Sequence, residues 1–441
     1  MPSGGSLLQI VAQGKQDVFL TGNPQFTYFK MIYQRHTNFA IEAQPMFFEG
    51  TPSFGQRVTC VIPRFGDLLG RTYLHVVLPL LTYPDPASGL PVPVSYVNSI
   101  GHALIQEITF EVGEHEIDRH TGEWMEIWTQ LTTTYSQLDA LNSMIGRSNG
   151  YSVPDNTPGI LSNGLELYIP LHFFFCRDTG WYLPLVALQH HTIRINLTIA
   201  PLQTLFYTSL LVTCPESPIQ VNPAQIVSME LWGDFVHLDI DERRRFVSSP
   251  HDYLIEQIQY TPVISIPNNQ SNISIHTNFN HPIREFQFVI QRDYMQQVNQ
   301  PFNFSSLAVN ETVSSILTSY FLPGQVRTDI ISEAILQIDG FDRFKIRPSS
   351  YFTTVQPYEH HTTTPVDNFI HTYSIALYPE KHEPSGSLNA TRINSMIWRL
   401  TINPILQLSG VNMGNIHARV YATNHNVFRI VDGFGGILFT I

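Results

Sequence analysis

The chain has 441 residues, enough for two domains, and 43 % of them are hydrophobic. Only 14 % are charged, and the formal net charge at pH 7 is −12. This composition excludes wholesale disorder, and the acidic balance argues against direct binding of nucleic acid, which requires clustered Lys and Arg. Low charge with 12 % aromatic residues is typical of subunits that are covered in an assembly. A carbohydrate-binding β-sandwich has the same profile, so composition leaves both classes open.

The first predicted element lies near the N-terminus. Ser6 and Gln9 form a capping box and Gly14 can end a helical turn, which predicts a short helix over residues 7–13. Two turns are too short to persist alone. We therefore expect residues 1–25 to be an anchor segment outside any core. Its apolar side chains need a partner surface and are the candidate assembly contacts: Leu7, Leu8, Ile10 and Val11.

Short strand-like segments dominate the rest of the chain, and the whole chain contains 30 proline and 26 glycine residues. In residues 192–199, for example, Ile193, Ile195, Leu197 and Ile199 share one face of a strand. Few helices separate these segments, which favours antiparallel sandwiches over βαβ units. The predicted strands are residues 58–62, 73–78, 108–112, 167–175, 192–199, 285–290, 335–338, 373–377 and 396–402.

One amphipathic helix interrupts the strands. Trp124, Ile127, Trp128 and Leu131 follow the i, i+3, i+4, i+7 spacing, which predicts a helix over residues 122–132. We expect this stripe of large side chains to pack on a sheet.

A domain boundary is expected at a charged helical turn over residues 239–245. The turn is followed by Pro250, which stops a helix, and then by a new strand. We therefore predict a first domain over residues 26–245 and a second over residues 246–441.

Possible catalytic and metal-binding motifs fail on their local context. Residues 146–150 match the G-x-S-x-G nucleophile elbow, but that motif needs a strand before the serine and a helix after it, and the sequence predicts neither. His115 and His120 are spaced HExxxH. Imidazoles five residues apart diverge on a helix and lie on opposite faces of a strand. We predict no catalytic residue, no cofactor, no metal site and hence no enzyme.

The cysteines indicate a reducing compartment. Cys60, Cys176 and Cys214 are far apart and odd in number, which supports neither a disulfide framework nor a zinc ribbon. No apolar run approaches the length of about 18 residues that a membrane span needs, and the N-terminus lacks the features of a secretory signal. We expect the protein to be made and kept on the cytosolic side.

A set of motifs in a fixed order carries a resemblance to a known family. The motifs occupy residues 5–17, 20–24, 27–30, 33–40, 169–175, 183–188, 238–246, 253–257, 373–380 and 384–389. The most specific run from Tyr373 to Glu380 and from Pro384 to Asn389. In sequence and order, these motifs resemble those of the major capsid proteins of nucleocytoplasmic large DNA viruses, the double jelly-roll family.

The resemblance implies an all-β fold of two consecutive eight-stranded antiparallel jelly rolls, with a few short helices in loops. It implies a homotrimeric, six-sided capsomer that tiles the icosahedral shell of a large double-stranded DNA virus. The implied partners are other copies of the chain, in the trimer and then in a trimer–trimer lattice, and minor capsid and penton proteins.

The resemblance also places an internal membrane nearby, while the chain itself has no transmembrane segment and binds no nucleic acid directly. The implied location is the virion capsid, assembled in the host cytoplasm. The residues leave one alternative open, a glycan-binding or glycan-cleaving β-sandwich protein.

Overall fold

The computed structural model describes residues 12–84, 91–147, 165–207, 225–267, 270–306, 328–365, 369–404 and 414–440. The chain divides into two units, an N-terminal arm over residues 1–39 and a compact body over residues 40–441.

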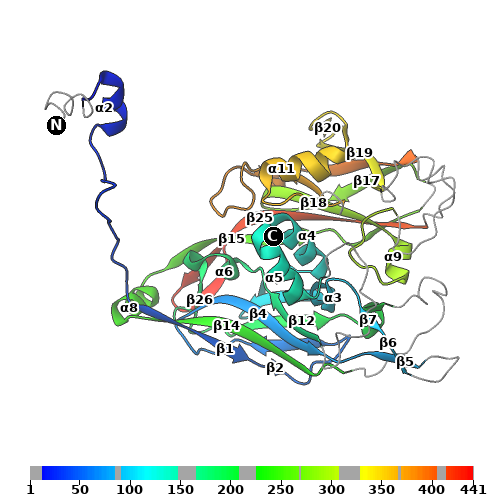
Figure 1. Cartoon of the computed structure of the whole chain (residues 1–441), viewed down its shortest axis with the longest axis horizontal. Helices are drawn as coiled ribbons and strands as arrows, with labels where there is room; N and C mark the ends of the chain where they lie inside the picture. The colour runs from blue at the N-terminus through cyan, green and yellow to red at the C-terminus, as the bar shows by residue number, and fades with distance from the viewer. Residues whose placement is uncertain are drawn as a thin grey trace, which may run out of the picture. The chain divides into compact units, whose positions relative to one another are not determined.

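The first half of the body is a sandwich of two antiparallel sheets (Figure 1). Sheet A contains, in spatial order, β1 (Phe39–Met46), β14 (Ser228–Leu238), β4 (Leu68–Leu78) and β10 (Leu165–Pro170), and β11 (Leu183–Pro184) also pairs with β4. Sheet B contains β2 (Phe48–Glu49), β3 (Arg57–Val61), β12 (Ile193–Ile199), β8 (Ile105–Val112) and β9 (His115–His120). Two small ribbons accompany them, β5 (Thr82–Pro84) with β6 (Pro91–Pro93), and β7 (Ser95–Tyr96) with β13 (Phe206–Tyr207).

The second half is a sandwich of the same kind. Sheet C contains β15 (His251–Tyr260), β25 (Ile416–Val431), β18 (Pro282–Arg292) and β22 (His371–Ser374), and β16 (Ile264–Ile266), β23 (Leu388–Asn389) and β26 (Phe434–Ile437) extend it. Sheet D contains β17 (Asn272–Thr277), β24 (Met396–Ile402), β19 (Ile331–Ile338) and β20 (Phe341–Asp342), and β21 (Arg347–Pro348) pairs with β19. Among the described residues, the strands of each sandwich pair only with strands of the same sandwich.

The two sandwiches share one topology. When the eight main strands of each are numbered along the chain, without the accessory strands, both have one sheet in the order 1-8-3-6 and one in the order 2-7-4-5. This pairing of strands distant in sequence is the jelly roll. The predicted fold class, two consecutive eight-stranded jelly rolls, is confirmed.

The helices lie between strands and are short. They are α2 (Lys15–Thr21), α3 (Ile100–Leu104), α4 (Gly122–Thr132), α5 (Tyr135–Ile145), α6 (Phe174–Arg177), α8 (Ile240–Ser248), α9 (Asp293–Gln297) and α11 (Gln356–His360), with the 3-10 turns η1 (Thr179–Trp181), η2 (Leu202–Thr204) and η5 (Ala390–Arg392) and the π-helical turn η3 (Tyr351–Val355). Among the described residues, none of these helices has the length and apolar character needed to cross a bilayer.

The predicted helix over residues 122–132 is confirmed as α4. It begins where the Thr121 hydroxyl accepts a hydrogen bond from the backbone N–H of Trp124, at 3.2 Å. The large side chains of its predicted stripe are buried: Trp124, Ile127, Trp128 and Leu131.

Two predicted strands end earlier than expected. The strand predicted over residues 167–175 stops at Pro170, and α6 begins at Phe174. Phe173 and Phe175 pack on Phe110 at centroid distances of 5.6 and 5.0 Å, which buries consecutive large residues that a half-exposed strand could not bury. The strand predicted over residues 373–377 ends at Ser374, because the backbone N–H groups of residues 375 and 376 both donate to the carbonyl of Arg284.

The arm also differs from expectation where it is described. Gly14 begins α2 instead of ending a helix, and its backbone N–H donates to the side chain of Asp17 at 2.9 Å. Residues 12 and 13 are not helical, and the rest of the predicted helix over residues 7–13 lies outside the described residues.

Each sandwich has an apolar core between its two sheets. In the second core, Trp398 is fully buried and lies 4.9 Å from Phe288, 5.8 Å from Phe286 and 5.9 Å from Tyr373, measured between ring centroids. Sheet C is buried on its other face too, and β18 is almost wholly buried along its length. This second face contacts the first sandwich.

Candidate functional site: the junction between the two sandwiches

The predicted assembly contacts Leu7, Leu8, Ile10 and Val11 lie outside the described residues. The next part of the arm carries side chains of the same kind. Its strongly exposed large residues are Phe19, Leu20, Tyr28, Phe29 and Met31. The described arm therefore presents large apolar side chains to solvent in the single chain.

Buried charges connect the two sandwiches. Glu256 of β15 is 2 % exposed and accepts hydrogen bonds from Arg177 of α6 and from Arg284 of β18. The two guanidinium groups also lie against the ring of Trp128 in α4, at 4.7 and 5.9 Å from its centroid. Burial lowers the pKa of Arg177 to about 9, with a contribution from the positive charge of Arg284. Both arginines remain charged at neutral pH, so the carboxylate between them holds the junction together.

A second buried charge group centres on His361, immediately after α11. Its Nε2 lies 3.2 Å from Glu285 Oε2 and its Nδ1 lies 3.1 Å from Glu380 Oε1. The side chains of His361 and Glu285 are 1 % and 0 % exposed. Burial by itself lowers the pKa of His361, but the two carboxylates outweigh it and raise the pKa to about 9. His361 is therefore an imidazolium in the folded protein at neutral pH.

The loop that carries His361 also holds the first sandwich directly. The backbone N–H of Thr363 donates to the carbonyl of Leu131 at 2.9 Å, and its hydroxyl donates to the carbonyl of Thr133 at 2.5 Å. These carbonyls belong to the C-terminal end of α4, where helix carbonyls have no partner within the helix. A loop of the second sandwich thus caps a helix of the first.

Strand β9 of the first sandwich runs beside β15 of the second. Asp118 accepts a hydrogen bond from the backbone N–H of Ile258 at 3.1 Å, and its second oxygen lies 2.8 Å from His120 Nε2. The side chain of Gln257 donates to the carbonyl of Ile117. His115 is exposed while His120 is buried, so the two histidines of the HExxxH spacing do not meet.

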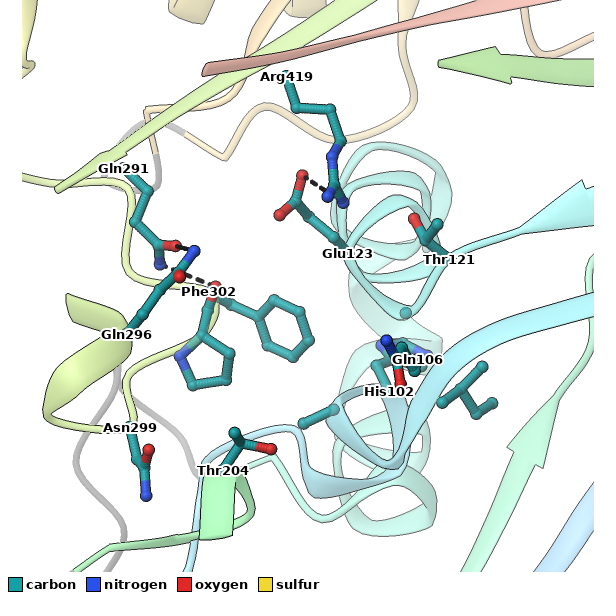
Figure 2. A pocket seen from close by; sticks show the side chains of 14 residues that line it. His102, Gln106, Thr121, Glu123, Thr204, Gln291, Gln296, Asn299, Phe302 and Arg419 are labelled. Atoms are coloured by element: carbon teal, nitrogen blue, oxygen red, sulfur yellow. Dashed lines mark hydrogen bonds and ion pairs between the residues drawn. The ribbon is translucent and has the colours of Figure 1, made fainter. Parts of the chain in front are cut away.

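A cavity of about 240 Å³ opens at the same junction (Figure 2). Glu123 and Arg419 face each other across the junction at 3.7 Å, and the Tyr421 hydroxyl donates to Glu123 at 2.9 Å. On the other side, the amide of Gln291 donates to the carbonyl of Pro301 at 2.9 Å. These polar groups of the wall bond to one another.

The chemistry of the junction is that of fixed charges. Among the described residues, no three His, Cys, Asp or Glu side chains are grouped so that they could hold a metal ion. Burial raises the pKa of Cys60 to about 12 and that of Cys176 to about 11, so neither thiol ionises at neutral pH. The loop predicted at residues 146–150 is described only to Arg147, and Gly146 ends α5 with a φ of 68°.

Sequence reasoning missed the junction charges because they come from segments far apart in the chain. One local signal existed. Arg284 and Glu285 stand side by side in a strand that also contains five large apolar residues, and charged residues are almost never fully buried unless they are paired.

Two jelly rolls of one topology in a single chain, locked together by buried charges, define the class of double jelly-roll capsid proteins. Residues 27–239 match the family described as the N-terminus of the major capsid protein, and residues 242–436 match the large eukaryotic DNA virus major capsid protein. The chain belongs to this family of major capsid proteins of large eukaryotic DNA viruses. It is a structural component of the virion capsid.

The sequences of individual relatives match this chain over almost its whole length. The chain is 35 % identical to the major capsid protein of Phaeocystis pouchetii virus, over 99 % of each chain. It is also 35 % identical to the major capsid protein of Pyramimonas orientalis virus, over 99 % of this chain and 100 % of that one. Among solved structures, PBCV-1 VP54 superposes with a TM-score of 0.74 and 27 % identity, over 94 % of this chain and 100 % of that one.

Proposed function

We propose that three copies of the chain form a homotrimeric, six-sided capsomer, and that these capsomers tile the icosahedral shell of a large double-stranded DNA virus. The observation that carries the proposal is the identical topology of the two sandwiches in one compact unit. One chain supplies two similar lobes, so three chains supply six, and a near-hexagonal block tiles a flat facet. The low charge content, 14 %, supports extensive contact between copies.

The proposed domain division is a first jelly roll over residues 26–245 and a second over residues 246–441. The pairing of strands supports it, because α8 connects the last strand of sheet A to the first strand of sheet C. Residues 1–25 are proposed as the anchor segment, with assembly contacts at Leu7, Leu8, Ile10 and Val11. The exposed apolar side chains of the described arm support this role.

The proposed partners beyond the lattice itself are minor capsid and penton proteins, which the anchor segment would contact on the inner side of the shell near an internal membrane. Assembly is proposed to occur in the host cytoplasm. The role is structural and not enzymatic, and the net charge of −12 supports a subunit that does not bind the genome directly.

Analytical ultracentrifugation of the purified chain tests the proposal. We expect a species of three times the chain mass of 50.2 kDa. A glycan-binding assay on the same sample tests the alternative, a glycan-binding or glycan-cleaving β-sandwich protein. A monomer that binds glycans would contradict the capsomer, and a trimer without glycan binding supports it.

A further inference from the structure

Within one chain, the elements of the first sandwich that contact the second sandwich all have topological equivalents in the second sandwich. The outer face of sheet C, which contains strands 1, 8, 3 and 6 of the second sandwich, is covered by the first sandwich. The covering elements are β9, which is strand 5, the helix α4 that follows it, and α6, which follows strand 6. Each of these elements has a counterpart in the second sandwich.

Those counterparts are exposed. They are β20, which is strand 5, then η3 and α11, and the segment after β22, which is strand 6. They carry large apolar side chains that face solvent in the single chain. Phe341 and Tyr358 are both 80 % exposed, and Leu377 and Tyr378 are more than half exposed. We call this surface the docking surface. It is exposed in the single chain, whereas the equivalent surface of the first sandwich is buried against sheet C.

The outer face of sheet A is the equivalent of the covered face of sheet C, and it is aromatic. Trp232 and Tyr73 stack at a centroid distance of 6.4 Å, and His75 and Tyr168 stack at 4.8 Å. Tyr168 is 38 % exposed. Within the body, sheet A and the elements β20 and α11 lie on opposite sides (Figure 1). A face and a complementary surface on opposite sides of one subunit allow head-to-tail contacts that close into a ring.

The docking surface is basic at its β20 end, whereas α11 and the segment after β22 also expose Glu359 and Glu383. The segment from β20 to β21 exposes Arg343, Lys345 and Arg347 within a few residues of one another, with Asp342 as its one acidic residue. Backbone pairing of β20 and β21 with β19 holds this segment at the edge of sheet D.

The outer face of sheet A is acidic. Glu230 and Asp234 of β14 and Glu166 of β10 lie on it, together with Arg71 of β4. The basic segment from β20 to β21 and the outer face of sheet A therefore have opposite charge, as surfaces that bind each other usually do.

We propose that the outer face of sheet A in one copy docks on the docking surface of a second copy, and so repeats between chains the contact that joins the two sandwiches within one chain. This inference rests on the proposed capsomer. Six similar contacts, three within chains and three between them, close a ring of six sandwiches. The aromatic and apolar residues form the centre of the contact, and the charged residues surround it.

A matched pair of variants tests the apolar part. Tyr358→Asp places a carboxylate in the proposed contact, and we expect the trimer to dissociate at concentrations at least tenfold higher than for the wild type. Tyr135→Asp, at a tyrosine of α5 that is also 90 % exposed and belongs to neither proposed surface, is the control and should leave the trimer unchanged. Circular dichroism checks that both variants fold, which their exposure favours. Equal trimer stability in the two variants would overturn the inference.

A charge exchange tests the orientation. Glu166→Lys with Glu230→Lys reverses the charge of these two positions on the outer face of sheet A. Arg343→Glu with Lys345→Glu reverses the charge of two positions on the docking surface. Each double variant should weaken the trimer, and the chain that carries all four substitutions should recover it, because every contact then joins two reversed surfaces. Lack of recovery would overturn the proposed pairing. A wild-type chain that forms no trimer would instead contradict the capsomer itself. A trimer whose stability is unchanged in all these variants would contradict only the proposed contact.

Discussion

Replacing His361 by glutamine should change how the stability of the chain depends on pH. The folded state raises the pKa of His361 to about 9 from the ordinary 6.5, because Glu285 and Glu380 together outweigh the effect of burial. A raised pKa means that the stabilisation is complete below pH 6.5 and is lost as the pH rises through 9. The difference between the two pKa values corresponds to about 3 kcal/mol, at 1.36 kcal/mol for each pH unit. The side chain is 1 % exposed, so solvent screens this value little.

The assay is denaturant unfolding of the wild type and of His361→Gln from about pH 6 to about pH 10, where the ordinary and raised histidine pKa values both lie. We expect a gap of about 3 kcal/mol near pH 6.5 that closes as the pH passes 9. His276→Gln, at an exposed histidine of β17 in the same sandwich, is the control and should run parallel to the wild type. If the His361→Gln curve also ran parallel to the wild-type curve over the whole range, His361 would not be held as an imidazolium, and the reasoning would be wrong.

Three further perturbations have defined outcomes. Glu256→Ala leaves two guanidinium groups in the junction without their carboxylate and should cost about 3–5 kcal/mol in chemical unfolding, whereas a loss below about 1 kcal/mol would show that water replaces the carboxylate. Trp398→Ala empties the centre of the second core and should also cost about 3–5 kcal/mol, measured in the same way; an unchanged midpoint would mean that the core is not packed around this ring. Deletion of residues 2–20 should leave trimers intact in ultracentrifugation while shell assembly, followed by light scattering, is impaired. Loss of the trimer itself on that deletion would contradict the anchor role.

The strand pattern was sufficient to predict antiparallel sandwiches, because alternation along a strand is a local property, whereas the two eight-stranded jelly rolls were implied by the family resemblance. Residues 193–199 show this, since the four residues predicted to share a face are all buried. The strand ends were harder, because they depend on tertiary contacts. Phe174 leaves the expected strand and packs on Phe428 of the second sandwich, at 5.9 Å between ring centroids, and no local pattern encodes that partner.

The junction charges could not be derived from the sequence for the same reason. Arg177, Glu256 and His361 are separated by roughly eighty or more positions, and only the folded chain brings their segments together. Sequence rules identify ion pairs three or four residues apart on a helix or opposite each other on neighbouring strands, and these pairs are neither. The one available signal of a buried ion pair was the occurrence of two adjacent charged residues, Arg284 and Glu285, in a strand with several large apolar residues.

Electron cryo-microscopy of the purified oligomer tests the central claim most directly. Because each chain contributes two sandwiches of one topology, projections down the symmetry axis should show six similar lobes related by threefold symmetry, with alternating contacts within and between chains. Isolated two-lobed particles at every concentration, or a ring with a number of lobes other than six, would contradict the account of this chain as a trimeric capsid building block.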